Sequence, residues 1–133
     1  MSLNELLVKA WYNQMWNNWD LSQVKLLTTT DIIFRGSLGQ DKIGHQGLIE
    51  YIRFVKIAFE DFRNSIEEII SENNKSFVRL QYTGTHTGEI FGIAPTYKKV
   101  SYSGAALFTF KEDKIANVWV LGDLHNLLNQ LKL

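Results

Sequence analysis

From Phe62 onward, apolar and polar residues alternate with a period of two, and this pattern constrains the fold more than any other feature of the sequence. The alternation covers four runs, residues 66–70, 78–82, 100–110 and 115–121. Short polar turns at 72–75 and 111–114 and a longer connection at 91–96 separate them. Alternation on this scale predicts strands, and short turns predict antiparallel neighbours. The second half of the chain is therefore expected to form a meander of four strands.

The first half of the chain has mostly helical periodicity. Apolar residues in the first 19 positions recur at helical spacing on more than one face, which predicts a helix covered on two sides. Asp20 is placed to cap a short second helix, and residues 31–35 read as a strand buried on both faces. Residues 48–59 form an amphipathic stripe, and leucines from 124 to 131 predict a short terminal helix.

The expected element order is α-α-β-α-β-β-β-β-α, an α+β class with a curved mixed or antiparallel sheet and covering helices. Glycines at 84, 88 and 104 predict sharp bends or bulges in that sheet. With 133 residues and no linker or repeat, we expect a single domain over residues 1–133. A curled sheet with helices on its concave side predicts an enclosed cavity.

Composition and motifs exclude several function classes. Lysine plus arginine and aspartate plus glutamate number 14 each without a basic cluster, so we expect no nucleic-acid partner. The absence of cysteine, of a signal peptide and of a membrane-length apolar run predicts a cytoplasmic protein with no membrane association. Histidine spacing predicts no metal site, and the lack of glycine-rich phosphate motifs predicts no cofactor.

Asp123 is the candidate catalytic residue. Alternation places its side chain on the same strand face as Trp119 and Leu121, so it is desolvated if that face is concave. A carboxyl group held out of water takes up a proton more readily and can act as acid and base near neutral pH. The alternative is that Asp123 caps the helix that begins at Leu124.

The candidate ligand-binding residues are polar groups near strand ends and aromatic groups at helical spacing. Arg35 ends an apolar strand, so its guanidinium either pairs with a buried acid or reaches a ligand oxygen. His86 either lines the mouth of the pocket or is satisfied by hydrogen bonds at a strand end. Aromatic side chains in the cavity would suit a flat or polycyclic ligand. The aromatic candidates are Trp119, Tyr51, Trp16 and Tyr12, with Trp11, Phe54 and Phe59 as further members of the set.

Three segments, DIIFRGSLG (31–39), GTHTGEIFGIAPT (84–96) and WVLGDL (119–124), resemble the SnoaL-like polyketide cyclase family. The resemblance implies a cone-shaped fold of the nuclear-transport-factor-2 type and a homodimer formed through the sheet. It also implies a cofactor-independent intramolecular aldol reaction. Asp123 would remove the proton next to an ester carbonyl and return a proton to the aldehyde oxygen.

Residues 104–109 depart from this family pattern, because Thr109 is the only polar side chain where the cyclases carry amide and imidazole partners. The carbonyl contact would then come from Arg35 or His86. Three hypotheses follow: a lyase or isomerase of the cyclase type acting on a small apolar carbonyl compound, a non-catalytic protein that binds a small hydrophobic ligand, or an epoxide hydrolase or dehydratase. The first requires Asp123 to point into the cavity, and the third requires a second acid or a histidine beside it.

Overall fold

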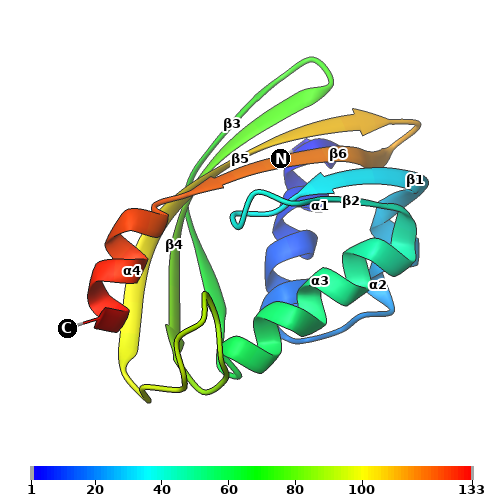
Figure 1. The fold of residues 1–133 in the computed structure, drawn as a ribbon. Helices are drawn as coiled ribbons and strands as arrows, with labels where there is room; N and C mark the ends of the chain where they lie inside the picture. Colours follow the sequence, from blue (N-terminus) through cyan, green and yellow to red (C-terminus); the bar gives the residue numbers. More distant parts are fainter. Residues whose placement is uncertain (1, 133) are drawn as a thin grey trace.

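The computed structural model describes residues 2–132 as one six-stranded sheet with helices packed against it (Figure 1). The helices are α1 (Leu3–Ala10), the π-helix η1 (Trp11–Asn17), α2 (Gln23–Leu27), α3 (Gly44–Ala58) and α4 (Leu124–Lys132). The strands are β1 (Thr28–Arg35), β2 (Asp41–Ile43), β3 (Arg63–Glu72), β4 (Lys75–Thr85), β5 (Lys99–Lys111) and β6 (Lys114–Gly122). Within this described part, none of the helices has the length and apolar character needed to cross a membrane.

The sheet has the order β2-β1-β6-β5-β4-β3. Strands β3 to β6 form the antiparallel meander that the alternation predicted. Strand β1 pairs with β6 in parallel, which makes the sheet mixed. The short edge strand β2, antiparallel to β1, was not predicted, because three residues are too few to show alternation.

The first helix differs from the regular helix that the spacing predicts. α1 continues into η1, where the chain adopts the wider turn of a π-helix, as in the hydrogen bond from the Asn18 N–H to the Asn13 carbonyl at 3.1 Å. Trp11, Tyr12 and Trp16 lie on the buried side of η1. A π-helix is rare and often marks a functional site.

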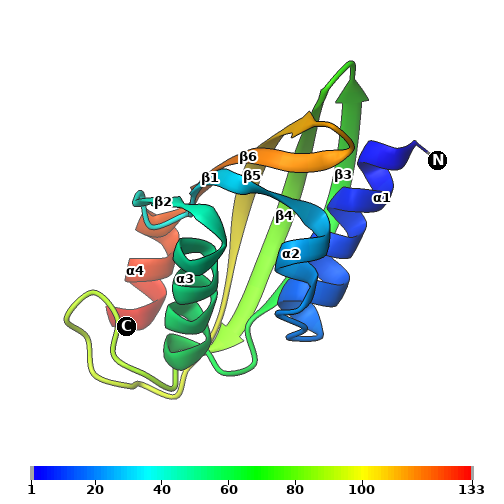
Figure 2. The same ribbon diagram turned by 90° about the vertical axis from the view of Figure 1, so that its right-hand side faces the viewer.

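The aromatic side chains of η1 pack against the inner face of the sheet. Trp11 lies 5.7 Å from Phe34 on β1 and 5.6 Å from Phe108 on β5, measured between ring centroids. Helices α1, α2 and α3 lie on the same side of the sheet (Figure 2). Burying an aromatic side chain of this size stabilises the fold by about 1.5–3 kcal/mol, so these contacts hold the curled sheet and the helices together.

The outer face of the sheet carries an apolar row that no helix within residues 2–132 covers. Cross-strand pairing places Trp119 beside Leu107, Leu107 beside Phe77 and Phe77 beside Ile70, so the four side chains run straight across β6, β5, β4 and β3. All four are more than a third exposed. We call these four residues the outer row.

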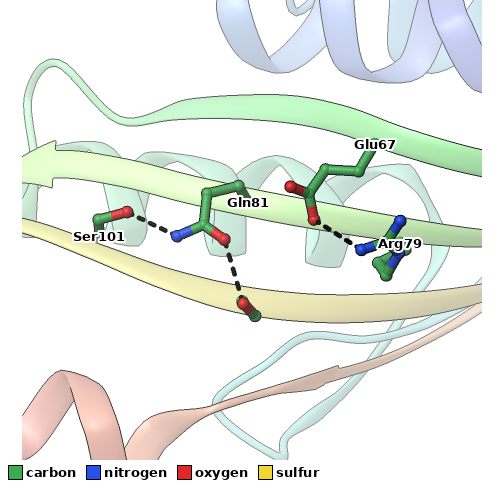
Figure 3. A network of polar contacts seen from close by, with 5 residues as sticks. Glu67, Arg79, Gln81 and Ser101 are labelled. Atoms are coloured by element: carbon green, nitrogen blue, oxygen red, sulfur yellow. Dashed lines mark hydrogen bonds and ion pairs between the residues drawn. The ribbon is translucent and has the colours of Figure 1, made fainter.

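Polar side chains border the outer row (Figure 3). Arg79 on β4 pairs with Glu67 on β3 at 3.6 Å, and farther along β4 the Gln81 amide donates to the Ser101 hydroxyl at 2.6 Å and accepts from the Ser103 hydroxyl at 3.1 Å. The outer face therefore has an apolar centre and a polar margin, an arrangement that resembles protein interfaces.

Candidate functional site

The predicted cavity lies between η1, α3 and the inner face of the sheet. The space open to the centre of a water-sized sphere is about 30 Å³, room for one or two water molecules. The lining residues are mostly aromatic or aliphatic, with a few hydroxyl and amide groups. They are Trp11, Tyr12, Trp16, Phe34, Ser37, Leu38, Tyr51, Val55, Phe59, Phe62, Asn64, Tyr82, Ile90, Tyr102, Val120 and Leu127.

Three cavity residues form a polar row across the sheet. Asn64 on β3 pairs with Tyr82 on β4, and Tyr82 pairs with Tyr102 on β5. Residues directly opposite each other project from the same face, so the three side chains point into the cavity side by side. All three are at most 4 % exposed.

Glycines make room for two of the cavity tyrosines. Tyr82 lies across Gly104, and Tyr51 lies across Gly36, so a Cβ atom at either glycine would overlap the facing ring. Both positions therefore need glycine because of the close approach of a side chain, a common reason for glycine within a strand pattern.

Four of the five tyrosines in the sequence line the cavity, and all four are held in the neutral form. Burial raises the pKa of Tyr12 well above its usual value, and the neighbouring Tyr82 raises it further. The pKa values of Tyr82 and Tyr102 are raised beyond the range of ordinary solution conditions, first by burial and then by the nearby phenols. Burial also raises the pKa of Tyr51. The cavity therefore presents O–H groups that remain hydrogen-bond donors at any physiological pH.

Two of the four tyrosine hydroxyls already interact with neighbouring groups of the protein. The Leu38 N–H donates to the Tyr51 hydroxyl at 3.4 Å, which ties the segment after β1 to α3. Ser37 interacts with the hydroxyls of both Tyr51 and Tyr102 and lowers their pKa values, against the larger effect of burial. The hydroxyl groups of Tyr12 and Tyr82 make no hydrogen bond with any group of residues 2–132, so they are free for a ligand.

Asp123 does not lie in the cavity. Strand β6 turns Val118 and Val120 inward, whereas Leu121, two residues before Asp123, is 53 % exposed. The Asp123 carboxylate is itself exposed and accepts a hydrogen bond from the Asn126 N–H at 3.2 Å, as an N-cap of α4 does. The expectation of a desolvated carboxyl on the concave face is therefore wrong, and the helix-capping alternative describes its position.

Arg35 and Trp119 contact each other on the outer side of the sheet. The Arg35 guanidinium donates to the Val120 carbonyl at 2.6 Å and lies 5.3 Å from the centre of the Trp119 ring. Arg35 thus pairs with no buried acid and is not among the lining residues of the cavity, although its positive charge lowers the pKa of the cavity residue Tyr51. The sequence predicted that Trp119 lines the cavity. Instead, Trp119 is 45 % exposed and belongs to the outer row.

His86 is fully buried, and its side chain is hydrogen-bonded within the connection between β4 and β5. Its Nδ1 accepts from the Thr96 N–H at 3.1 Å and lies 3.0 Å from the Thr96 hydroxyl. Its ring also packs 5.7 Å from Phe59, which does line the cavity. His86 therefore stands behind the cavity wall and not at the mouth. Its Nδ1 is hydrogen-bonded at the end of the strand, whereas its buried Nε2 has no hydrogen-bond partner within residues 2–132.

Some of the aromatic candidates line the cavity, and others are exposed on the surface. Tyr12, Trp16 and Tyr51 line the cavity as expected, and so do Trp11 and Phe59, whereas Phe54 on α3 is 47 % exposed. Sequence reasoning missed Asn64, Tyr82 and Tyr102. A signal was present, because Tyr82 and Tyr102 continue the buried alternation of Leu80 and Val100. No three residues among positions 2–132 form a cluster suited to a metal ion.

Solved structures with a similar fold show the class of protein to which this chain is similar. A proposed SnoaL-like polyketide cyclase from Jannaschia sp. CCS1 superposes with a TM-score of 0.89 and 17% identity, covering 97% of this chain and 91% of the other. AclR, a proposed hydroxylase from Streptomyces galilaeus, gives 0.77 and 25%, covering 90% and 78%. A Catenulispora acidiphila protein with a ketosteroid isomerase-like fold, in complex with trimethylamine, gives 0.81 and 16%, covering 96% and 92%. The fold is the nuclear-transport-factor-2-like α+β cone.

The sequence narrows the class to a family. The model of the SnoaL-like polyketide cyclases matches residues 6–131, nearly the whole chain, and the protein belongs to that family. No curated protein matches the chain.

The neutral tyrosines predict a defined loss of stability in alkali. Below about pH 10 the phenols are protonated in both folded and unfolded chains, whereas above it only the unfolded chain releases their protons. The free energy of unfolding should then fall by up to about 1.4 kcal/mol per pH unit for each tyrosine. Urea unfolding at a series of alkaline pH values measures this slope.

The matched variant is Tyr82→Phe, which should unfold with a smaller alkaline slope by about one proton. A wild-type stability that stays constant as phenolate absorbance rises would contradict the assignment of neutral, buried phenols.

Proposed function

We propose that the chain binds a small, mostly apolar compound that carries a carbonyl oxygen, and that tyrosine hydroxyls in the cavity donate to this oxygen. The observation that carries the proposal is the chemistry of the lining: aromatic and aliphatic walls with two unpaired phenol donors, Tyr12 and Tyr82. Such a lining can donate to a carbonyl oxygen, and it disfavours an anion because its unpaired donors are neutral and shielded from bulk water.

Membership of the SnoaL-like family supports a cavity that acts on or holds an organic ligand. The related Catenulispora protein, in complex with trimethylamine, supports small-molecule binding by this fold. The cavity residues Tyr12, Trp16 and Tyr51 were candidates from the sequence, and Tyr82 and Tyr102 complete the same set.

The small volume of the cavity limits the size of the ligand that should be tested first. An apolar cavity of about 150 Å³ is needed for a benzene ring, far more than the space present here. A ligand must therefore displace wall side chains. Leu38 and Ile90 are suited to this, because each sits in a connection between strands and not within a helix or strand. A single-ring ketone is a better probe than the polycyclic ligand that the aromatic content suggested.

Tyr82→Phe tests the donor role directly. It removes the hydroxyl and leaves the ring that packs 5.6 Å from Phe62 and 5.0 Å from Tyr102. Loss of one hydrogen bond should weaken acetophenone binding roughly two- to ten-fold by calorimetry, with little change for ethylbenzene, which has no carbonyl.

Tyr97→Phe is the matched control, because Tyr97 is 70 % exposed and lies outside the cavity. Equal losses for both variants, or equal losses for ketone and hydrocarbon, would overturn the proposed donor.

The second candidate function is cofactor-independent acid/base catalysis by Asp123, as in the family's cyclases. One observation favours it: Gly122, the residue before Asp123, packs against Ser37 and Tyr102 of the cavity wall. Asp123 thus directly follows a residue of the wall, and this hypothesis requires the first turn of α4 to rotate its carboxyl toward the cavity. The epoxide hydrolase or dehydratase alternative has less support, because no histidine or carboxylate is among the lining residues of the described chain.

Asp123→Asn distinguishes catalysis from binding. The enzyme hypothesis predicts at least a hundred-fold loss of proton exchange next to a ligand carbonyl, the usual scale for losing a general base, with ligand affinity unchanged. Exchange of the methyl protons of acetophenone with D₂O, followed by NMR, measures this. Exchange at the rate of the protein-free buffer in the wild type would leave binding as the function.

We also propose that two copies of this chain associate through the outer row. The row is apolar at its centre, and its margin carries both signs of charge on Arg79 and Glu67, so the face can be self-complementary about a two-fold axis. Monomeric proteins rarely leave contiguous apolar patches of this kind uncovered.

Leu107→Lys places a charge at the centre of the outer row and should convert the dimer to a monomer. Light scattering during gel filtration should give twice the chain mass of 15.4 kDa for the wild type and once that mass for the variant. Ile57→Lys on α3 is the control, since Ile57 is equally apolar and 71 % exposed but lies away from the sheet face. A wild type that elutes as a monomer would refute the interface.

A further inference from the structure

Asn64 stands out among the cavity residues because it is the only amide side chain in an aromatic wall. It is 4 % exposed and begins the polar row that continues through Tyr82 and Tyr102. A buried amide is costly unless its hydrogen-bonding groups are used. Its partners therefore show which of its atoms remains available.

Asn17, the last residue of η1, fixes the orientation of the Asn64 amide. The Asn17 Oδ1 accepts from the Asn64 backbone N–H at 2.8 Å, and the Asn17 Nδ2 donates to the Asn64 carbonyl at 2.8 Å. These two bonds settle which end of the Asn17 amide is oxygen. The Asn64 side chain approaches that same oxygen at 3.4 Å, so the atom facing it must be the Nδ2 donor.

The Oδ1 of Asn64 is then left as an acceptor. It receives no hydrogen bond from any other residue between positions 2 and 132, and its side chain lines the cavity beside Tyr82. Tyr82 carries a neutral donor and Asn64 an acceptor, and the two residues face each other on adjacent strands. The wall therefore offers one donor and one acceptor at neighbouring positions.

We infer that Asn64 determines specificity: its Oδ1 selects ligands that carry an O–H or N–H donor beside the carbonyl group that Tyr82 binds. Asn17 is a positioning residue that keeps this acceptor turned toward the cavity. The inference rests on the proposed ligand binding and adds a second required group to the ligand. A compound without the donor leaves a desolvated acceptor unpaired, and this lowers its affinity.

Paired ligands test the inference without knowledge of the natural one. The probes are 3-hydroxyacetophenone and its methyl ether, in which a methyl group replaces the hydroxyl proton and so removes the donor. Calorimetry on the wild type should show the hydroxy ketone binding about five- to ten-fold more tightly. Asn64→Leu should bring this ratio close to one, mainly by weakening the hydroxy ketone. Asn129→Leu, an exposed asparagine of α4, should leave the ratio unchanged.

The outcomes separate this inference from the proposed function. Binding of both compounds with the same ratio in wild type and Asn64→Leu overturns the acceptor role and leaves the cavity as the binding site. Failure of both compounds to bind the wild type overturns both proposals. If Asn64→Leu does not fold, the ¹³C resonance of the Asn64 side-chain carbonyl in the wild type decides. It should shift with the hydroxy ketone and not with the ether, and an equal response to both would count against the inference.

Discussion

The contact between the π-helix η1 and the inner face of the sheet organises the whole molecule. Trp11 packs against β1 and β5 at once through Phe34 and Phe108, and Tyr12 packs 5.9 Å from Phe108. The short segment η1 supplies three side chains to the cavity, Trp11, Tyr12 and Trp16. The same aromatic contacts that stabilise the fold therefore form the wall of the site.

This shared role explains the electrostatic character of the site. A cavity built from core aromatic residues is shielded from bulk water, and this burial keeps the phenols neutral. The polar groups that remain are held by neighbours, Tyr51 by Leu38 and Asn64 by Asn17. The resulting wall can recognise a neutral oxygenated compound through a few fixed hydrogen bonds, whereas a charged ligand would lose its hydration without a partner.

The sequence predicts the meander and the helix order well because strands β3 to β6 are long, and because the β3–β4 and β5–β6 connections turn sharply at polar residues. The strand faces were harder to predict. Strand β6 is apolar on both sides, with Val118 and Val120 inside and Trp119 and Leu121 outside, so alternation alone could not say which face is concave. Asp123 was misplaced for this reason. The widened turn of η1 also has no distinct signature, because apolar residues occur on several faces of the first helix.

The central claim is that the cavity tyrosines surround a bound carbonyl compound. The most direct measurement is ¹³C NMR of the protein labelled at the ζ carbon of tyrosine, with and without saturating 3-hydroxyacetophenone. The account predicts shifts for Tyr12, Tyr51, Tyr82 and Tyr102, with the exposed Tyr97 unchanged. A ligand that shifts Tyr97 alone, or binds without moving any of the four cavity resonances, would contradict it.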